Sequence, residues 1–269
     1  MTDATANNNP QRVGWPTWVR ALWVHGFFYS RVWKGSITTS FLFPTLYLTA
    51  MGVGLGSLVD HHVHHVGGVR YLAFLAPGLL AGTILQVATG ESTFPVLGRI
   101  KWQRTYYAML ATPLSATDVV IGHLIWIAIR GAMVSSIFLL VMLLFGCVHS
   151  PLALLVIPLA SVAAFAFAAP TTAFAATTKS ENSFPLFYRF GVIPLFLFSA
   201  TFFPLEQLPT ALRYLAQATP LVHVVLLMRS LTLGTFFPVQ NLVDLGYLVA
   251  LSIVGWRFAN KAFKRRLVV

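Results

Sequence analysis

The sequence predicts an all-α integral membrane protein. We expect six transmembrane helices, an amphipathic N-terminal interfacial helix before them, and a re-entrant helical hairpin between spans five and six. Three observations predict this class. The chain is 57% hydrophobic and only 9% charged, which is far from the composition of soluble domains. Long apolar runs recur along the chain, and lysine and arginine concentrate in alternate connections between them.

The first residues differ from everything that follows. Residues 1–12 are polar and lack the apolar core and small-residue cleavage site of a signal peptide. They are expected to form a disordered cytoplasmic tail, and residues 13–269 a single transmembrane domain. Residues 13–34 carry tryptophans at helical spacing, with Arg20 and Arg31 at other positions, which suits a helix in the headgroup layer. A membrane anchor and a functional contact are both compatible with this pattern.

Six apolar segments are long enough to cross a hydrocarbon core about 30 Å thick. They are 37–59, 71–93, 119–148, 152–177, 184–203 and 242–258, the last with help from its neighbours 239 and 259. Ser115 and Asp118 have the spacing of a capping box and predict the start of the third helix. Prolines inside the spans are tolerated where neighbouring helices satisfy the freed carbonyls.

Residues 201–229 are apolar but do not form a clean span. Three charges and three prolines interrupt them, namely Glu206, Arg213, Arg229, Pro204, Pro209 and Pro220. The longest stretch free of both is 221–228, which covers only about 12 Å as a helix. We expect two short helices that enter the outer leaflet and return.

The distribution of positive charge supports this topology. With six spans and both termini cytoplasmic, all but four of the 18 lysines and arginines lie on the inner side. Arg70, Arg213 and Arg229 lie outside, and Arg130 lies within a span. If 201–229 crossed the membrane, the basic C-terminal tail would move outside. The net charge of +11 is therefore explained by basic residues that orient the chain in the membrane. No nucleic acid is expected as a partner.

Motifs for catalysis are missing from the sequence. It has no GxxxxGK[ST] loop, and Gly52, Gly54 and Gly56 lie inside the first span, where helix packing is the better interpretation. GxSxG, HExxH and CxxC are also absent, and the chain has one cysteine. The seven acidic residues are scattered, so no convergent site for a membrane-bound transferase is visible. A secondary transporter, the main alternative class, would show carboxylates at mid-membrane or inverted repeats.

Four histidines in the first outer loop are the strongest metal signal. The run HHVHH contains His61, His62, His64 and His65, and imidazoles can hold zinc or copper or gain charge below about pH 6.5. A short loop need not orient them, and only Asp60 offers a nearby carboxylate. We favour an exposed cluster without a role and predict no metal site.

Two charges fall inside predicted spans, where charges are costly and normally face protein or water. Glu91 lies near the inner end of the second span, and Arg130 lies about three turns into the third. Our hypothesis is an intramembrane ion pair that fixes the two helices around the cytoplasmic segment between them. The alternative is that each side chain reaches separately to the inner headgroups.

The cytoplasmic segment 94–118 has an unusual pattern for a loop. A basic start is followed by aromatic and aliphatic residues at helical spacing. This suits docking to a soluble partner, and it also suits contact with the anionic inner leaflet.

Three stretches together carry a family resemblance that covers nearly the whole chain. They are the amphipathic helix 15–29, the stretch GRIKWQRTYYAMLATPLSATDVVIGHLIW at 98–126, and the stretch FFPLEQLPTALRYLAQATPLVHVVLLMR at 202–229. The chain resembles the membrane permeases of type-2 ABC exporters (the ABC-2 family), in the subgroup related to the nodulation permease NodJ and to drug-exporter permeases.

The resemblance implies a mechanism. Two permease copies, expected as a homodimer, would pair with two ABC ATPase subunits that hold ATP and Mg, while this chain binds no cofactor and catalyses nothing itself. Residues 99–112 match the family's coupling helix. The implied ATPase-docking residues are Arg99, Lys101, Trp102, Arg104, Tyr106, Tyr107, Met109 and Leu110.

The resemblance also implies a pathway between the two permeases and an outer gate. Pathway candidates on spans one and five are Phe41, Phe43, Tyr47, Phe196, Phe198 and Phe202. Gate candidates in the re-entrant element are Pro204, Glu206, Pro209, Arg213 and Pro220. The expected location is the cytoplasmic membrane of a bacterium, with lipids as further partners. The expected cargo is an amphipathic or hydrophobic drug, lipid or lipid-linked glycan.

Overall fold

A computed structural model describes residues 16–51, 54, 69–235 and 237–267, and the elements within them are all helices. In chain order they are α1 (Thr17–Tyr29), α2 (Trp33–Thr49), α4 (Tyr71–Ser92), α5 (Phe94–Lys101), α6 (Thr105–Leu110), α7 (Ala116–Leu144), η2 (Pro151–Leu155), α8 (Val156–Thr177), α9 (Ser183–Phe187), the π-turn η3 (Tyr188–Val192), α10 (Ile193–Leu197), η4 (Leu205–Gln207), α11 (Thr210–Gln217), α12 (Pro220–Leu233) and α13 (Pro238–Leu267).

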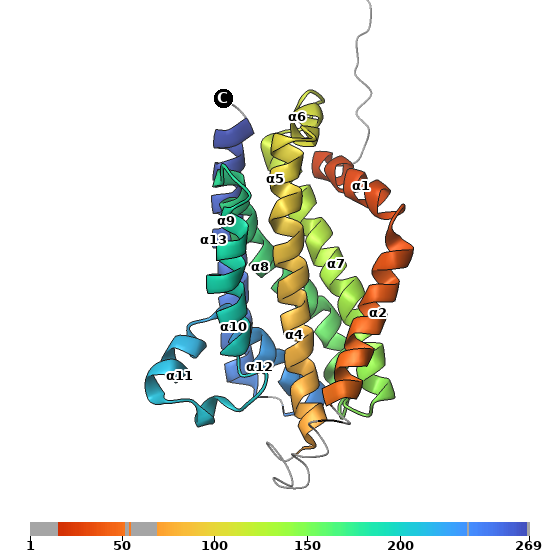
Figure 1. The fold of residues 1–269 in the computed structure, drawn as a ribbon, viewed down its shortest axis with the longest axis vertical. Coiled ribbons are helices and arrows are strands. Elements are labelled where there is room, and N and C mark those ends of the chain that lie inside the picture. The colour runs from red at the N-terminus through yellow and green to blue at the C-terminus, as the bar shows by residue number, and fades with distance from the viewer. Residues whose placement is uncertain (1–15, 52–53, 55–68, 236, 268–269) are drawn as a thin grey trace, which may run out of the picture.

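The long helices run side by side along the long axis of the molecule (Figure 1). At one end lie α1, α6 and the C-terminal end of α13; we call this the α6 end. At the opposite end lie α11 and the start of α13, and we call this the α11 end. Because α9–α10 arrives at the α11 end and α13 leaves from it, α11 and α12 form an excursion that begins and ends on one side.

Four helical segments are long and apolar enough to cross a membrane within the described part of the chain. They are Tyr71–Lys101, Ala116–Leu144, Pro151–Thr177 and Pro238–Leu267. A fifth is reached only if α11 and α12, which are bent by 83° relative to each other, count as one span. The predicted class of a helical membrane protein is therefore confirmed.

The first predicted span is only partly within the described residues, and the fifth is shorter than predicted. The helix of the first, α2, has 17 residues, and the rest of that span lies mostly outside the described residues. The fifth, predicted over 184–203, is the helical stretch Ser183–Leu197. At about 1.5 Å per residue this stretch covers about 22 Å. The count of six spans stays a prediction.

Local chemistry explains where the helices begin and end. The predicted capping box at α7 is confirmed, because the Asp118 N–H donates to Ser115 Oγ at 3.1 Å and the Ser115 N–H donates to Asp118 Oδ2 at 3.0 Å. The helix α10 ends at Leu197, since Phe198 leaves helical geometry with φ −96° and ψ 14°, and the positive φ of 59° at Ala200 keeps the helix from resuming. The predicted interfacial helix is also interrupted, since α1 ends at Tyr29 and α2 begins only at Trp33.

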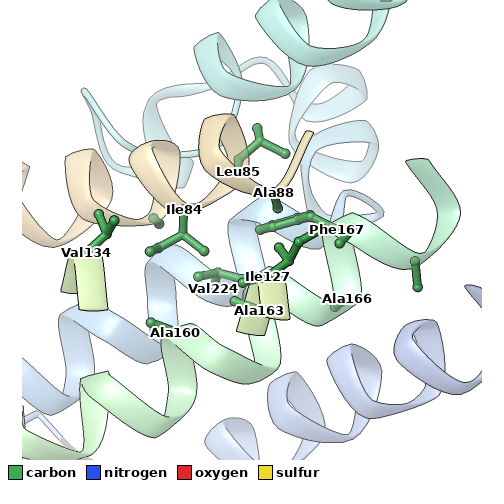
Figure 2. Close-up of a cluster of buried hydrophobic side chains, with 14 of the residues drawn as sticks. Ile84, Leu85, Ala88, Ile127, Val134, Ala160, Ala163, Ala166, Phe167 and Val224 are labelled. Carbon is green, nitrogen blue, oxygen red and sulfur yellow. The ribbon is translucent and has the colours of Figure 1, made fainter. Parts of the chain in front are cut away.

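The core forms around α8, which packs against α13, α7 and α4. Figure 2 shows α8 alanines facing Ile84 of α4, Ile127 of α7 and Val224 of α12. Small residues let the helix backbones approach closely, as is common in membranes. A Cβ on Gly131 would lie 2.7 Å from Ala164 Cβ, and one on Gly255 would lie 2.8 Å from Pro170 Cδ. The α7–α8 and α13–α8 contacts therefore both depend on a glycine.

Candidate functional site

The α5–α6 segment presents a basic and aromatic surface at the α6 end. Lys101 ends α5, and Arg104, with a positive φ of 52°, turns the chain so that α6 begins at the next residue. Four predicted docking residues are exposed there: Lys101, Trp102, Arg104 and Tyr107. Exposed cations beside exposed aromatic rings suit a protein partner, because aromatic residues and arginine dominate the centres of interfaces.

The other predicted docking residues on α6 face the protein. Tyr106 is fully buried, with its ring 5.4 Å from that of Phe263, and burial raises the pKa of its hydroxyl. Met109 is also buried, and Leu110 is half-buried. The contact between Tyr106 and Phe263 holds α6 against the end of α13. Tyr106 and Met109 are therefore not accessible to a docking partner.

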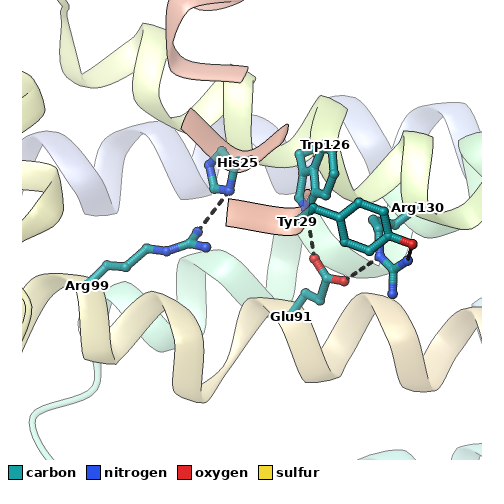
Figure 3. Close-up of polar contacts among 6 residues, drawn as sticks. All are labelled: His25, Tyr29, Glu91, Arg99, Trp126 and Arg130. Carbon is teal, nitrogen blue, oxygen red and sulfur yellow. Dashed lines mark hydrogen bonds and ion pairs between the residues drawn. The ribbon is translucent and has the colours of Figure 1, made fainter. Parts of the chain in front are cut away.

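Arg99 links α5 to α1. Its guanidinium lies 3.1 Å from His25 Nδ1, and His25 is 3% exposed (Figure 3). Burial, and then the charge of Arg99, lower the pKa of His25 from 6.5 to about 3. His25 is therefore neutral at ordinary pH, and its Nδ1 accepts the hydrogen bond from Arg99.

Glu91 and Arg130 lie within 2.9 Å of each other, measured from Arg130 Nε to Glu91 Oε1. Each has a further partner. Trp126 Nε1 donates to Glu91 Oε2 at 3.1 Å, and Arg130 donates to the Tyr29 hydroxyl at 2.9 Å. The side chains are only 29% and 12% exposed, so these extra bonds offset part of the cost of desolvating the pair. As Figure 3 shows, the cluster joins α4, α7 and α1.

The predicted pathway aromatics separate into two groups. Phe43 and Tyr47 of α2 and Phe196 of α10 line one narrow cavity of about 50 Å³ against α4. The remaining three do not line it: Phe41 and Phe198 are exposed, and Phe202 packs on Phe196 with ring centroids 5.3 Å apart.

The predicted gate residues surround the two short helices at the α11 end. Pro209 precedes α11, and Pro220 is the first residue of α12, where a missing N–H costs nothing. Glu206, Pro209 and Arg213 are exposed, and Pro204 and Pro220 are half-buried.

Two polar links that attach α12 escaped the sequence analysis. Arg229 donates to the carbonyl of Phe74 at 3.2 Å and to that of Ala200 at 2.9 Å, with its guanidinium 3.6 Å from the centre of the Phe74 ring. His223 Nδ1 lies 2.7 Å from Oδ1 of the buried Asp244. The available signal is a histidine and a carboxylate on two neighbouring helices, but only the packing of α12 on α13 distinguishes Asp244 from the other scattered acids.

Metal ligands do not converge within the described residues, where no group of three or more His, Cys, Asp or Glu side chains is placed to hold an ion. His61, His62, His64 and His65 lie outside those residues.

Comparison with known proteins gives one consistent result. Residues 20–233 match the pattern of the ABC-2 type transporter family. The Nodulation protein J of Rhizobium leguminosarum bv. viciae is 31% identical over 88% of this chain and 91% of that protein. The Nodulation protein J of Rhizobium meliloti (strain 1021) is 27% identical over 94% and 99%. The Inner membrane transport permease YadH of Escherichia coli (strain K12) is 24% identical over 77% and 80%.

Proposed function

Because the chain belongs to the ABC-2 type transporter family, we propose that it is the permease subunit of an exporter driven by a separate ATPase. Members of this family are membrane transport components and not catalytic enzymes, and they generally work with an ABC ATPase partner. In our proposal two permease copies form a homodimer and two ATPase subunits hold the ATP and Mg. The cargo is an amphipathic or hydrophobic drug, lipid or lipid-linked glycan.

One observation carries the docking part of this proposal. The exposed residues Lys101, Trp102, Arg104 and Tyr107 lie together at the α6 end, on a segment that continues directly from α4. The contact between Arg99 and His25 links this segment to α1, and the ion pair between Glu91 and Arg130 links α4 to α7. A displacement of α6 by the ATPase would therefore reach several helices at once.

The proposed topology places the α6 end in the cytoplasm. Six spans then correspond to α2 with its continuation, α4, α7, α8, α9–α10 and α13, while α11 and α12 form the re-entrant outer element. The position of α6 and of the end of α13 at one end of the molecule supports cytoplasmic termini. The name of the YadH relative supports the inner membrane.

The transport pathway is proposed to form between two permease copies. Exposed aromatics on α2 and around α10, including Phe41 and Phe198, would line it. The outer gate would consist of α11 and α12, and their attachment to α4 and α13 would couple the gate to the bundle.

Docking is tested with two matched double variants, each removing one exposed arginine and one exposed tyrosine. Arg104→Ala with Tyr107→Ala alters the α6 end, and Arg213→Ala with Tyr214→Ala alters the α11 end. We expect the first to weaken co-purification with the ATPase by about tenfold or more, since interface aromatics and arginines dominate binding. The second should leave it unchanged. Stimulated ATP hydrolysis that survives the α6 change would contradict the docking proposal.

Topology is tested separately by cysteine labelling of intact cells with a membrane-impermeant maleimide. The native Cys147 should react little with the maleimide, because it is 1% exposed and burial raises the pKa of its thiol to about 11. We expect Arg213→Cys to react from outside and Trp102→Cys to react only after the cells are opened. If position 213 reacted only from the cytoplasm, the topology and the outer gate would both be wrong.

A further inference from the structure

A groove about 560 Å³ in volume runs between α8 and α13 at the α6 end. Its lining contains none of the exposed docking residues of α5 and α6, and the two surfaces meet where the Tyr107 hydroxyl donates to the Arg266 carbonyl at 3.5 Å. Its lining residues are Pro170, Ala173, Phe174, Ala176, Thr177, Phe258, Lys261, Ala262, Arg265 and Arg266. No acidic residue is among them. The lining divides into a basic end and apolar walls.

The basic end combines one anchored and two free cations. Arg266 donates to the carbonyls of Ala176 and Thr178 at 3.4 and 3.2 Å, which ties α13 to the end of α8. Lys261 and Arg265 are one helical turn apart on the same face of α13 and are exposed. Neither forms an ion pair with any residue in the described part of the chain. Two uncompensated positive charges therefore face the mouth of the groove.

The walls below this mouth are apolar. Phe174 of α8 and Phe258 of α13 stand on the two sides, and Phe258 is seven residues, or about 10 Å of helix, from Arg265. The deep end closes where Gly255 lets α13 approach Pro170. Polarity thus changes from cationic to apolar along the helix axes, in the direction from the molecule's end toward its middle.

We propose that this groove binds one anionic glycerophospholipid, with its phosphate on Lys261 and Arg265 and an acyl chain against Phe174 and Phe258. Charge complementarity supports this occupant, since uncompensated cations meet a phosphate at the level where the apolar walls begin. A soluble anion would leave the apolar walls uncovered, and a basic protein surface would be repelled. The inference rests on the proposed function only where it assigns this lipid to the cytoplasmic leaflet of the membrane.

The binding test uses the full chain in nanodiscs that contain phosphatidylglycerol and phosphatidylcholine with identical acyl chains, followed by native mass spectrometry. The wild type should retain phosphatidylglycerol in preference to phosphatidylcholine. The double variant Lys261→Gln, Arg265→Gln should lose about tenfold or more of this preference, since each basic group near an anionic lipid contributes about fivefold. Ala173→Trp fills the groove without changing charge and should also release the lipid.

A matched control removes two other exposed cations from the same helix. Arg257→Gln with Lys264→Gln leaves the groove lining intact and should keep the preference. Equal loss in both double variants, or retained lipid in Ala173→Trp, would overturn the site in favour of general attraction to the basic helix. If the partner ATPase displaces the lipid and the groove variants lose the ATPase, the groove is a protein contact and the proposal is wrong. Lipid binding is read without transport, so failure of the proposed function would not mimic either result.

Discussion

The two ends of the bundle are held together in different ways. At the α6 end, side chains on different helices contact each other, as Glu91 with Arg130 and Arg99 with His25. The helical segment Tyr71–Lys101 there is also long, because α5 follows α4 after the single residue Thr93. At the α11 end the helices are short and sharply bent, and the polar links converge on α12. Arg229 reaches backbone carbonyls of α4 and of the turn after α10, and His223 contacts Asp244 of α13.

In the proposed function, this difference would make the α6 end the part that transmits motion and the α11–α12 element the part that changes its angle. Links between side chains on α1, α4, α5 and α7 make the α6 end respond as a unit. At the α11 end the polar links converge on α12, while α11 packs mainly on α12 itself. In the proposed function, an ATPase acting at α6 would therefore move a connected set of helices, and the proposed outer element formed by α11 and α12 would be the part free to change its angle.

The largest change in stability is expected from a double-mutant cycle at the α6 end, which tests this contrast. Glu91→Gln and Arg130→Met should each lower the free energy of unfolding by about 3 kcal/mol, because each leaves a charge or its partners uncompensated in a poorly solvated site. The double variant should cost less than the sum of the two. Denaturant unfolding in detergent measures this, and additive losses would show that the two residues act separately.

A smaller effect is expected at the α11 end. Arg229→Lys keeps the positive charge but loses the planar fork that donates to two carbonyls, so it should lower the free energy of unfolding by about 2 kcal/mol. The control Arg213→Lys changes an exposed side chain and should stay within about 0.5 kcal/mol. If the two variants behaved alike, Arg229 would not hold α12 in place.

The smallest effect concerns pH. The folded state lowers the pKa of His25 from 6.5 to about 3, so the unfolded chain takes up a proton first as the pH falls. The contribution of His25 is therefore complete above pH 6.5 and is lost progressively as the pH falls toward 3. Between pH 7 and pH 5.5 the wild type should lose about 1 kcal/mol of stability relative to His25→Gln. Thermal unfolding of both proteins across this range measures the difference, and parallel curves would mean that folding does not lower the pKa of His25.

Hydropathy was enough to locate α4, α7, α8 and α13, because the apolar character of a long segment follows from its residues alone and does not depend on tertiary contacts. It did not predict the early end of α10. Phe202 and Phe203 continue the apolar run, whereas the backbone leaves helical geometry at Phe198 and takes a positive φ at Ala200. Hydropathy contains no information about such a turn.

The candidate site is also predictable from the sequence only in part. The sequence shows that Glu91 and Arg130 are charges in apolar surroundings, and antiparallel helices suggest that they are neighbours. Trp126 lies one helical turn before Arg130 on α7 and donates to Glu91 from there. Tyr29 and His25 join the cluster only because α1 packs across α7, and this packing depends on three-dimensional geometry. For the same reason the sequence could not separate the buried Tyr106 from the exposed Tyr107.

The glycine contacts of α8 have a consequence for how this chain tolerates mutation. In a soluble domain the largest core residues are the ones that resist replacement. Here α7 and α13 touch α8 through Gly131 and Gly255, where even a methyl group collides with a neighbouring helix. Many of the large apolar residues instead point away from the protein, as Val239 and Leu242 do. A complete mutational scan should therefore be less permissive at Gly131 and Gly255 than at exposed large residues such as Val239 and Leu242.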